Sequence, residues 1–318
     1  MLIRELTDGQ EVEQVLVVRS AECRRKRDGD EFLKLSLGDR TGSLTACIWD
    51  GVAEVRGCAT PGAAVLVSGR FELHARYGPQ LSVRRLRAAD PHEYAPDDLF
   101  DGPPRDADQM EADLRELIGT IQSPHLRLLL EALLGPGSET WARYREAPAA
   151  KYYHQAYRHG LLEHCLSVAQ GVSAISATFP GIDRDVAVTG ALLHDIGKLD
   201  AYTSDPACID MTDSGRLQGE IPLGYYRIRR AVEDIGGFPP ALEEAVLHII
   251  LSHHGTLEHG SPVVPCTREA TLVHMVDNLG GRLGSFDRIE KELPDGQQWS
   301  SFDRALGGGA YFAAREAA

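Results

Sequence analysis

Apolar and polar residues alternate in short runs along the first 90 residues. Five of these runs are rich in β-branched and aromatic residues: VEQVLVV (12–18), EFLKLSL (31–37), SLTACIW (43–49), AAVLVSGRFEL (63–73) and QLSVRRLR (80–87). Turn signals such as Asp28-Gly29 and Tyr77-Gly78 separate them. The pattern predicts five β-strands, with a short helix between Gly51 and Gly57.

The pattern changes after residue 90. Residues 91–106, PHEYAPDDLFDGPPRD, are rich in proline and acidic side chains, which predicts a linker. From residue 107 onward apolar residues recur with helical spacing, as in ADQMEADLRELIGTI and PHLRLLLEALLG. We therefore expect a multidomain α and β protein, with a five-stranded OB-fold β-barrel over 1–90 and an all-α domain over 107–318.

Four metal-binding residue types lie inside apolar helical segments. His164 stands beside the apolar face of GLLEHCLSVAQGVSAI, and His194 and Asp195 close the segment DVAVTGALLHDIGK. Asp277 lies within TREATLVHMVDNLGGRL. Charged residues rarely lie in such surroundings unless they are paired or bound to metal. The H…HD…D order predicts a divalent metal site whose bound hydroxide hydrolyses a phosphoester.

A second group of ligands lies between Asp195 and Asp277 in the sequence. Glu220 falls in GRLQGEIPLG, and His253 and His254 end the segment ALEEAVLHIILSHHG. These residues predict a second ion with Asp195 as the bridge, about 3.5–4 Å from the first. For His254 a structural role as a cation at the end of a helix is the alternative.

Two cations are candidates for catalytic support. Lys198 follows the His-Asp pair by three residues, where an ammonium would stabilise charge on a phosphate, or would simply end a helix. Arg158, in KYYHQAYRHG, offers a guanidinium fork for phosphate. Gly197 is expected to end its helix in the left-handed conformation.

Charge is distributed unevenly along the chain. Residues 1–90 contain 14 Lys and Arg against 13 Asp and Glu, whereas the whole chain has a formal net charge of −14. Because phosphate contacts dominate nucleic-acid affinity, we expect the barrel to hold any nucleic acid. The candidate backbone contacts are Arg24, Arg25, Lys26, Arg27, Arg84 and Arg85, and the candidate stacking residues are Phe32, Trp49, Phe71 and Tyr77. A solvated hairpin tip and aromatic residues of the barrel core are the alternative interpretations.

Composition narrows the class of protein. The six cysteines form no CxxC pair, which favours reduced thiols in the cytoplasm over a disulfide framework. The chain shows no apolar run of about 18 residues and no signal-peptide core at its start, so we expect no membrane association.

Several segments resemble a known family: HGLLEHCLSV, ALLHDIGKL, GRLQGEI, LSHHGTLEHGSPVVP and LVHMVDNL. They resemble the HD-domain phosphohydrolases and, more narrowly, the YhaM-type 3′–5′ exoribonucleases, which join an OB-fold to an HD domain. The resemblance implies a metal-dependent nuclease, often using manganese, that releases nucleoside 5′-monophosphates from single-stranded RNA. The chain departs from the family at Glu220, where the family typically has histidine, and at His159, where it tends to have a small residue.

Other interpretations remain open. A carboxylate at Glu220 still suits hard ions such as Mn²⁺ or Mg²⁺, and Co²⁺ or Fe²⁺ also fit such ligands. Single-stranded DNA is a second candidate substrate, and a homo-oligomer is a candidate assembly. The alternative functions are a phosphodiesterase for a small nucleotide or cyclic dinucleotide, and a single-strand-binding protein with a degenerate site.

Overall fold

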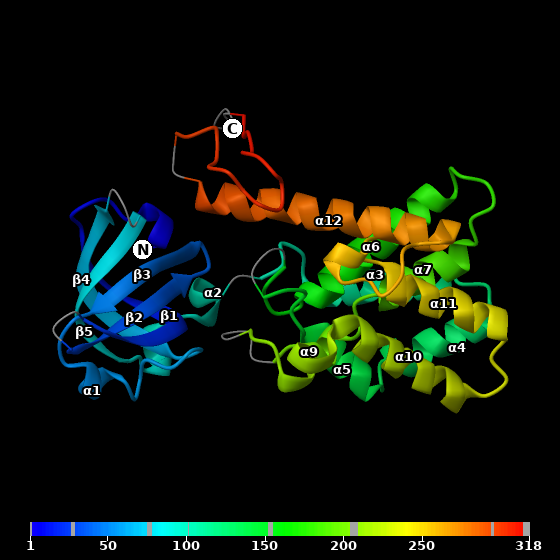
Figure 1. Ribbon diagram of the computed structural model, residues 1–318, viewed down its shortest axis with the longest axis horizontal. Coiled ribbons are helices and arrows are strands. Elements are labelled where there is room, and N and C mark those ends of the chain that lie inside the picture. Colours follow the sequence, from blue (N-terminus) through cyan, green and yellow to red (C-terminus); the bar gives the residue numbers. More distant parts are fainter. Residues whose placement is uncertain are drawn as a thin grey trace. The chain divides into compact units, whose positions relative to one another are not determined.

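The structure, a computed structural model, describes residues 2–26, 29–74, 78–100, 102–151, 155–203, 209–293 and 296–313. It divides into two compact units (Figure 1). The first holds the described residues of 1–102 and 289–318, and the second holds those of 103–204 and 209–288. Each unit has its own hydrophobic core. Arg27 and Tyr77, two candidate nucleic-acid contacts, lie outside the described residues.

Five strands close into a barrel in the first unit. They are β1 (Glu11–Arg25), β2 (Glu31–Asp39), β3 (Gly42–Ile48), β4 (Ala64–His74) and β5 (Gly78–Ala88). Their order around the barrel is β1-β2-β3-β5-β4, with β3 and β5 parallel and the other pairs antiparallel. The short helix α1 (Val52–Val55) follows β3. This arrangement is that of an OB-fold, so the predicted fold class is confirmed.

Strand β1 is longer than its alternating run predicts. Its first half pairs with β4 from Glu11 to Val17, and its second half pairs with β2 as far as Arg25. A register shift between Val18 and Ser20 separates the two halves. An irregularity of this kind bends a strand, so one strand serves two neighbours and the sheet closes. The sequence of this second half, RSAECRR, is mostly polar, so the pattern of apolar residues did not predict that the strand continues.

The barrel core consists of the inward side chains of the alternating runs. Phe71 is 3% exposed within that core. Its predicted role as a stacking residue is therefore wrong, because a ring enclosed by the barrel cannot reach a base.

The second unit is helical. Its helices are α3 (Ala107–Gly119), α4 (Pro124–Leu134), α5 (Glu139–Glu146), α6 (Gly160–Ser176), α7 (Arg184–Leu193), α8 (Lys198–Ala201), α9 (Asp213–Gln218), α10 (Glu220–Ile235), α11 (Pro240–Ser252) and α12 (Arg268–Glu292). Residues 289–292 of α12 are assigned to the first unit. Short helical turns also lie at Ile3–Glu5, Pro91–Glu93, Pro96–Leu99 (α2) and Leu257–His259. Among the described residues no helix has the length and apolarity to cross a membrane.

Helices α6 and α7 lie side by side at the centre of this unit, with α11 against α7 and α10 against α11. Most side chains of α6 and all but two of α7 are buried. A helix that is apolar on nearly every side is stable only inside a core. The two helices therefore provide a rigid support for the polar residues that they carry.

Gly197 does not have the expected left-handed conformation, since its φ is −68°. Its lack of a side chain has a different cause. A Cβ atom at Gly197 would lie 2.0 Å from the carbonyl oxygen of Glu220 and 2.5 Å from the amide nitrogen of Gly224. Glycine is thus required here because α10 begins in direct contact with the segment that follows His194 and Asp195.

Candidate metal centre

Three predicted ligands come together from three helices. His164 comes from α6, His194 follows the last residue of α7, and Asp277 comes from α12. The Nε2 atoms of His164 and His194 lie 3.2 Å apart, and Nε2 of His164 lies 3.0 Å from Oδ1 of Asp277. One potential ligand atom of each residue lies within 4.8 Å of the others. We call this group the first cluster.

Four residues form the second cluster: Asp195, Glu220, His253 and His254. Nε2 of His254 lies 3.1 Å from Oε1 of Glu220, the residue that departs from the family pattern. Nδ1 of His254 lies 2.8 Å from the carbonyl oxygen of His259. Both ring nitrogens of His254 thus contact groups outside its own helix, which is unlike a residue that caps a helix end.

Asp195 lies between the two clusters. Its Oδ2 atom is 3.3 Å from Nε2 of His164 and 3.4 Å from Nε2 of His194. Its Oδ1 atom is 3.5 Å from Nε2 of His253. One carboxylate therefore presents an oxygen to each cluster, which is the geometry that a bridging ligand requires.

The imidazoles are oriented as metal ligands are. Nδ1 of His194 lies 2.8 Å from the carbonyl oxygen of Ala191, and Nδ1 of His253 lies 2.8 Å from that of Ile250. A carbonyl can only accept a hydrogen bond, so Nδ1 carries the proton, and in the neutral ring Nε2 carries a lone pair. Nε2 of His253 is buried and makes no hydrogen bond with the described residues. Donor types, orientation and this nitrogen, whose contact is Oδ1 of Asp195 at 3.5 Å, all fit a divalent metal.

Burial disfavours the charged forms of the candidate ligands, but interactions with neighbouring charged groups outweigh this effect. Burial raises the pKa of Asp277, but hydrogen bonds from His164 and His194 hold the pKa of this carboxyl well below its ordinary value. Burial also raises the pKa of Asp195, yet Lys198 and His194 bring it well below the ordinary value. Burial lowers the pKa of His194, whereas the charge of Asp195 raises it well above the usual range. Without a metal, protonated imidazole balances these carboxylates, and a cation would displace those protons.

Lys198 is a buried cation beside both clusters. Its side chain is 9% exposed, and Nζ lies 2.7 Å from Oδ2 of Asp195. Burial lowers the pKa of Lys198, but Asp195 and then Glu220 raise it above the ordinary value. The ammonium therefore stays charged and offsets part of the negative charge of the site.

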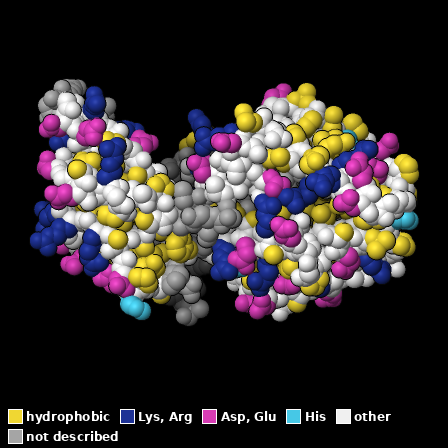
Figure 2. Space-filling view, turned by 90° about the horizontal axis from the view of Figure 1, so that it is seen from below, with side chains coloured by type: hydrophobic (Ala, Val, Ile, Leu, Met, Phe, Trp, Pro, Cys, Tyr) yellow, Lys and Arg dark blue, Asp and Glu magenta, His cyan; other side chains and the backbone are white. Residues whose placement is uncertain are grey.

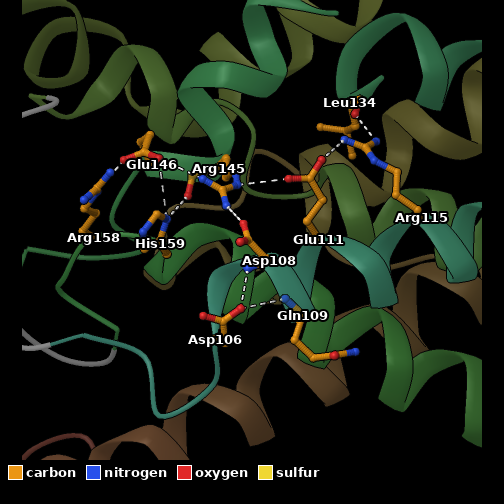
Figure 3. Close-up of polar contacts among 10 residues, drawn as sticks. All are labelled: Asp106, Asp108, Gln109, Glu111, Arg115, Leu134, Arg145, Glu146, Arg158 and His159. Carbon is orange, nitrogen blue, oxygen red and sulfur yellow. Dashed lines mark hydrogen bonds and ion pairs between the residues drawn. The ribbon is translucent and has the colours of Figure 1, made fainter. Parts of the chain in front are cut away.

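Arg158 lies in a separate polar network (Figure 3). Its guanidinium is paired with Glu146, which also pairs with Arg145. His159 has a left-handed backbone (φ 67°), and its Nδ1 lies 2.7 Å from the carbonyl oxygen of Arg145. The network fixes the start of α6, the helix that carries His164. The side chain of Arg158 is 58% exposed, and its role toward phosphate stays a prediction.

Two aromatic residues form a stacked pair on the barrel. The rings of Phe32 on β2 and Trp49 after β3 have centroids 4.7 Å apart and planes at 21°. Trp49 is 48% exposed. Arg24 on β1 stands opposite Phe32 in the sheet. The pair lies on the strands where OB-folds commonly bind single strands, so a base could stack on the outer face of Trp49.

The basic residues of the barrel are partly neutralised. Arg24 pairs with Glu22 on the same strand, and Arg84 pairs with Glu11. Lys26 lies 3.7 Å from Asp50. Arg25 and Arg85 are exposed on β1 and β5. Exposed pairs are weak and exchange with solvent ions, so they leave these cations accessible to phosphate.

On the face of the second unit that Figure 2 shows, acidic side chains do not form one continuous surface. On the face in Figure 2, Lys and Arg side chains intermingle with Asp and Glu over the helices. Because both signs of charge are mixed on this face, its electrostatic potential toward a phosphate is not of one sign.

Sequence reasoning gave no ligand role to two residues near the clusters. Cys165 is buried, and with His194 and Asp195 it forms a third group of potential ligands. Its position directly after His164 was an available signal. The second is His274 on α12, whose Nδ1 lies 2.7 Å from the carbonyl oxygen of His253. It therefore holds the backbone that carries two of the ligands.

Comparisons with known proteins agree with this geometry. Residues 161–281 match the model of the HD domain. The 3′–5′ exoribonuclease YhaM of Geobacillus sp. (strain WCH70) is 31% identical over 295 residues, which cover 91% of this chain and 88% of that protein. The protein of the same name from Bacillus subtilis (strain 168) is 30% identical over 292 residues, covering 91% and 90%.

The helical unit and its paired clusters of histidine and carboxylate define an HD-domain hydrolase. The preceding OB-fold barrel and the similarity along nearly the whole chain narrow the class further. The chain belongs to the YhaM family of 3′–5′ exoribonucleases, and it is a hydrolytic nuclease.

Proposed function

We propose that this chain is a metal-dependent 3′–5′ exoribonuclease that hydrolyses single-stranded RNA. The observation that carries the proposal is the pair of ligand clusters joined by Asp195, in a chain similar along 91% of its length to a relative named for that activity. The direction of degradation is supported by the relatives' names, since nothing in the site encodes polarity. We also propose single-stranded DNA as a substrate, because it presents the same phosphodiester and the same stacking faces.

We infer a ligand set for each of two ions. The first ion would be held by His164, His194, Asp195 and Asp277, and the second by Asp195, Glu220, His253 and His254. When bound, divalent ions lower the pKa of water at their open positions and neutralise charge on a phosphate. Mn²⁺ suits a mixture of imidazole and carboxylate, and Mg²⁺, Co²⁺ and Fe²⁺ are the other candidates.

The chain's own residues contribute charge and orientation. Lys198 keeps its proton and offsets the carboxylates of Asp195 and Glu220, so a phosphate meets less repulsion. The imidazoles are held by backbone carbonyl groups, so their orientation is set before substrate arrives. Arg158 would release its partner Glu146 and bind an outer phosphate of the substrate in its place.

The barrel would capture the strand. Trp49 and Phe32 would stack a base, while Arg24, Arg25, Lys26, Arg84 and Arg85 would contact the backbone. We also propose that the activity is cytoplasmic, since the six cysteines of the sequence show no disulfide-framework pattern and would stay reduced there.

The test is hydrolysis by full-length protein that has been stripped with a chelator and then reloaded with Mn²⁺, Mg²⁺, Co²⁺ or Fe²⁺. The substrates are single-stranded RNA, single-stranded DNA of equal sequence and a panel of mononucleotides and cyclic dinucleotides. The proposal expects no activity after stripping and recovery on RNA with at least one ion. Recovery on a small nucleotide but not on RNA would identify a nucleotide phosphodiesterase instead. Binding of RNA without hydrolysis under any ion would identify a binding protein with a degenerate site.

A further inference from the structure

The hydroxyl of Tyr144 is a buried polar group outside the two ligand clusters. Tyr144 lies on α5, and its side chain is fully enclosed in the helical core. Its hydroxyl donates a hydrogen bond to the carbonyl oxygen of Leu192, at a distance of 2.8 Å. Leu192 is the last residue but one of α7, two positions before His194. A buried hydroxyl costs free energy unless it is bonded, so this bond accounts for a tyrosine where phenylalanine would fill the same space.

The end of α7 is bonded by three different donors. The last carbonyl groups of an α-helix have no partner within the helix itself. At the end of α7, three consecutive carbonyl groups each accept a hydrogen bond from a donor beyond the helix: Ala191 from Nδ1 of His194, Leu192 from the hydroxyl of Tyr144, and Leu193 from the backbone N–H of Ile196. Of these three bonds, the tyrosine bond comes from another helix, so it fixes the end of α7 relative to α5.

Tyr144 also interacts with α6. Cys165 directly follows His164 on that helix and is buried. Burial raises the pKa of Tyr144 well above its ordinary value, and the neighbouring Cys165 raises it further through charge and a hydrogen bond. The phenol therefore keeps its proton and remains a hydrogen-bond donor to Leu192. One side chain of α5 thus contacts both the helix that carries His164 and the helix that leads into His194.

The ring of Tyr144 is held in place by its neighbours on and near α5. Trp141, one turn earlier, stacks on it with ring centroids 6.0 Å apart and planes at 29°. The guanidinium of Arg115 lies over the Trp141 ring, 4.2 Å from its centroid. Arg143, on the same helix, donates a hydrogen bond to the carbonyl oxygen of Leu199 on α8. Helix α5 carries none of the candidate ligands, yet its side chains contact α6, α7 and α8 around them.

We propose that Tyr144 is a positioning residue of the metal centre. Its hydroxyl holds the end of α7 against α5 and α6, and thereby sets the spacing between the rings of His164 and His194. Their Nε2 atoms lie 3.2 Å apart and come from different helices, so this spacing depends on how the helices are held together. The ligands of a functional site must stay within about 0.5 Å of the productive geometry. The inference rests on the metal dependence proposed above.

The effect of Tyr144 should be confined to the first cluster. His253 and His254 follow the last residue of α11, and Glu220 begins α10. The interactions of Tyr144 described above go to α6 and α7. Loss of the hydroxyl should therefore weaken binding of the first ion by about 10–100-fold, the usual effect of removing a group that orients a ligand. Binding of the second ion should change far less, because only Asp195 belongs to both proposed ligand sets.

The test is a calorimetric titration of the full-length, metal-free protein with Mn²⁺. Tyr144→Phe removes one oxygen and keeps the ring, and sucrose in every titration stabilises a weakened fold. We expect two binding events in the parent and a loss of affinity in one of them in the variant. A general loss of stability would instead lower both affinities. Thr189→Val is the matched control and should match the parent, because the Thr189 hydroxyl is buried on α7 itself and makes no hydrogen bond with the described residues.

Two ligand variants identify which ion is affected. Asp277→Ala removes a ligand of the first cluster only, so adding Tyr144→Phe to it should cause no further loss of affinity. Glu220→Ala removes a ligand of the second cluster only, so adding Tyr144→Phe to it should cause the full loss. Equal affinities in Tyr144→Phe and the parent would overturn the inference, and so would a full further loss in the Asp277→Ala background. A parent that binds no divalent ion would contradict the proposed metal dependence itself, and this inference with it.

Discussion

Asp195 and Lys198 form an ion pair that is almost entirely enclosed, with Nζ 2.7 Å from Oδ2 and side chains 2% and 9% exposed. The same carboxylate faces both ligand clusters. The ammonium therefore sits where it can compensate the site's negative charge whether or not a cation is bound. This relationship makes Lys198 important for stability as well as for chemistry.

Replacing Lys198→Met should destabilise the metal-free protein strongly. Removal of one partner of a buried pair leaves the other charge uncompensated, which costs about 3–5 kcal/mol. A saturating divalent metal should reduce that loss, because it supplies positive charge beside Asp195. Denaturant unfolding with and without metal measures both effects. Arg56→Met is the control, since the Arg56–Glu31 pair is exposed and should cost less than about 1 kcal/mol. Equal losses in the two variants would show that the buried pair has no special role.

The stacked pair on the barrel should control capture of the strand. Trp49→Ala should weaken binding of single-stranded RNA by about 1–3 kcal/mol, the usual contribution of one stacked base. Hydrolysis of a small chromogenic phosphodiester should not change, because that substrate does not need the barrel. Fluorescence anisotropy and steady-state kinetics give the two readouts. Tyr226→Ala removes an aromatic side chain that is 60% exposed on α10 and should leave both unchanged. Unchanged RNA affinity in Trp49→Ala would show that the stacked pair does not bind the strand.

The carboxylate of Glu220 should set the metal preference of the second cluster. Glu220→His restores the residue that the family typically has, and it should shift preference from Mn²⁺ or Mg²⁺ toward metals that favour imidazole. Glu220→Ala should lower the occupancy of one ion and leave the first cluster loaded. Elemental analysis and activity across Mn²⁺, Mg²⁺, Co²⁺ and Zn²⁺ would measure this. If both variants keep the parent's metal content and preference, Glu220 is not a ligand.

Gly255 should be intolerant of any side chain. Its φ is 83°, and a Cβ atom would lie 2.0 Å from the ring of His274, which contacts the backbone of His253. Gly255→Ala should therefore displace His253 and His254, lowering metal affinity together with the unfolding temperature. Gly236→Ala is the matched control, because its φ is 66° but no atom of the described residues lies within 4 Å of a Cβ there. If both variants lose metal affinity to a similar extent, the effect comes from backbone strain alone and not from the contact with His274.

Most of the fold could be predicted from local patterns in the sequence. The five alternating runs identified the five strands of the barrel, because one face of each strand is buried and the other is not. The second half of β1 was not predicted as a strand because it is polar. Arg24 and Arg25 belong to the strand because their backbone pairs with β2, and their side chains are not buried. Phe71 was misjudged for a related reason: the sequence does not say which side of a strand faces the core.

The candidate ligands were predictable because histidine and aspartate in apolar helices are unusual by themselves. What the sequence could not provide was the arrangement between helices. The close approach that Gly197 allows to Glu220, the contact of His274 with the backbone of His253, and the pairing of Arg158 with Glu146 are all contacts between elements. No local pattern encodes them.

The most direct measurement of the central claim uses RNA labelled at either end. With the metal-loaded parent, RNA labelled at its 3′ end should release labelled mononucleotide from the first turnover, while RNA labelled at its 5′ end should shorten progressively. Asp195→Ala removes the carboxylate between both clusters and should reduce hydrolysis by more than about a hundredfold while RNA binding persists. Asp234→Ala, an exposed aspartate on α10, should match the parent. Early release of mononucleotide from the 5′-labelled end, or substantial turnover by Asp195→Ala, would contradict the account.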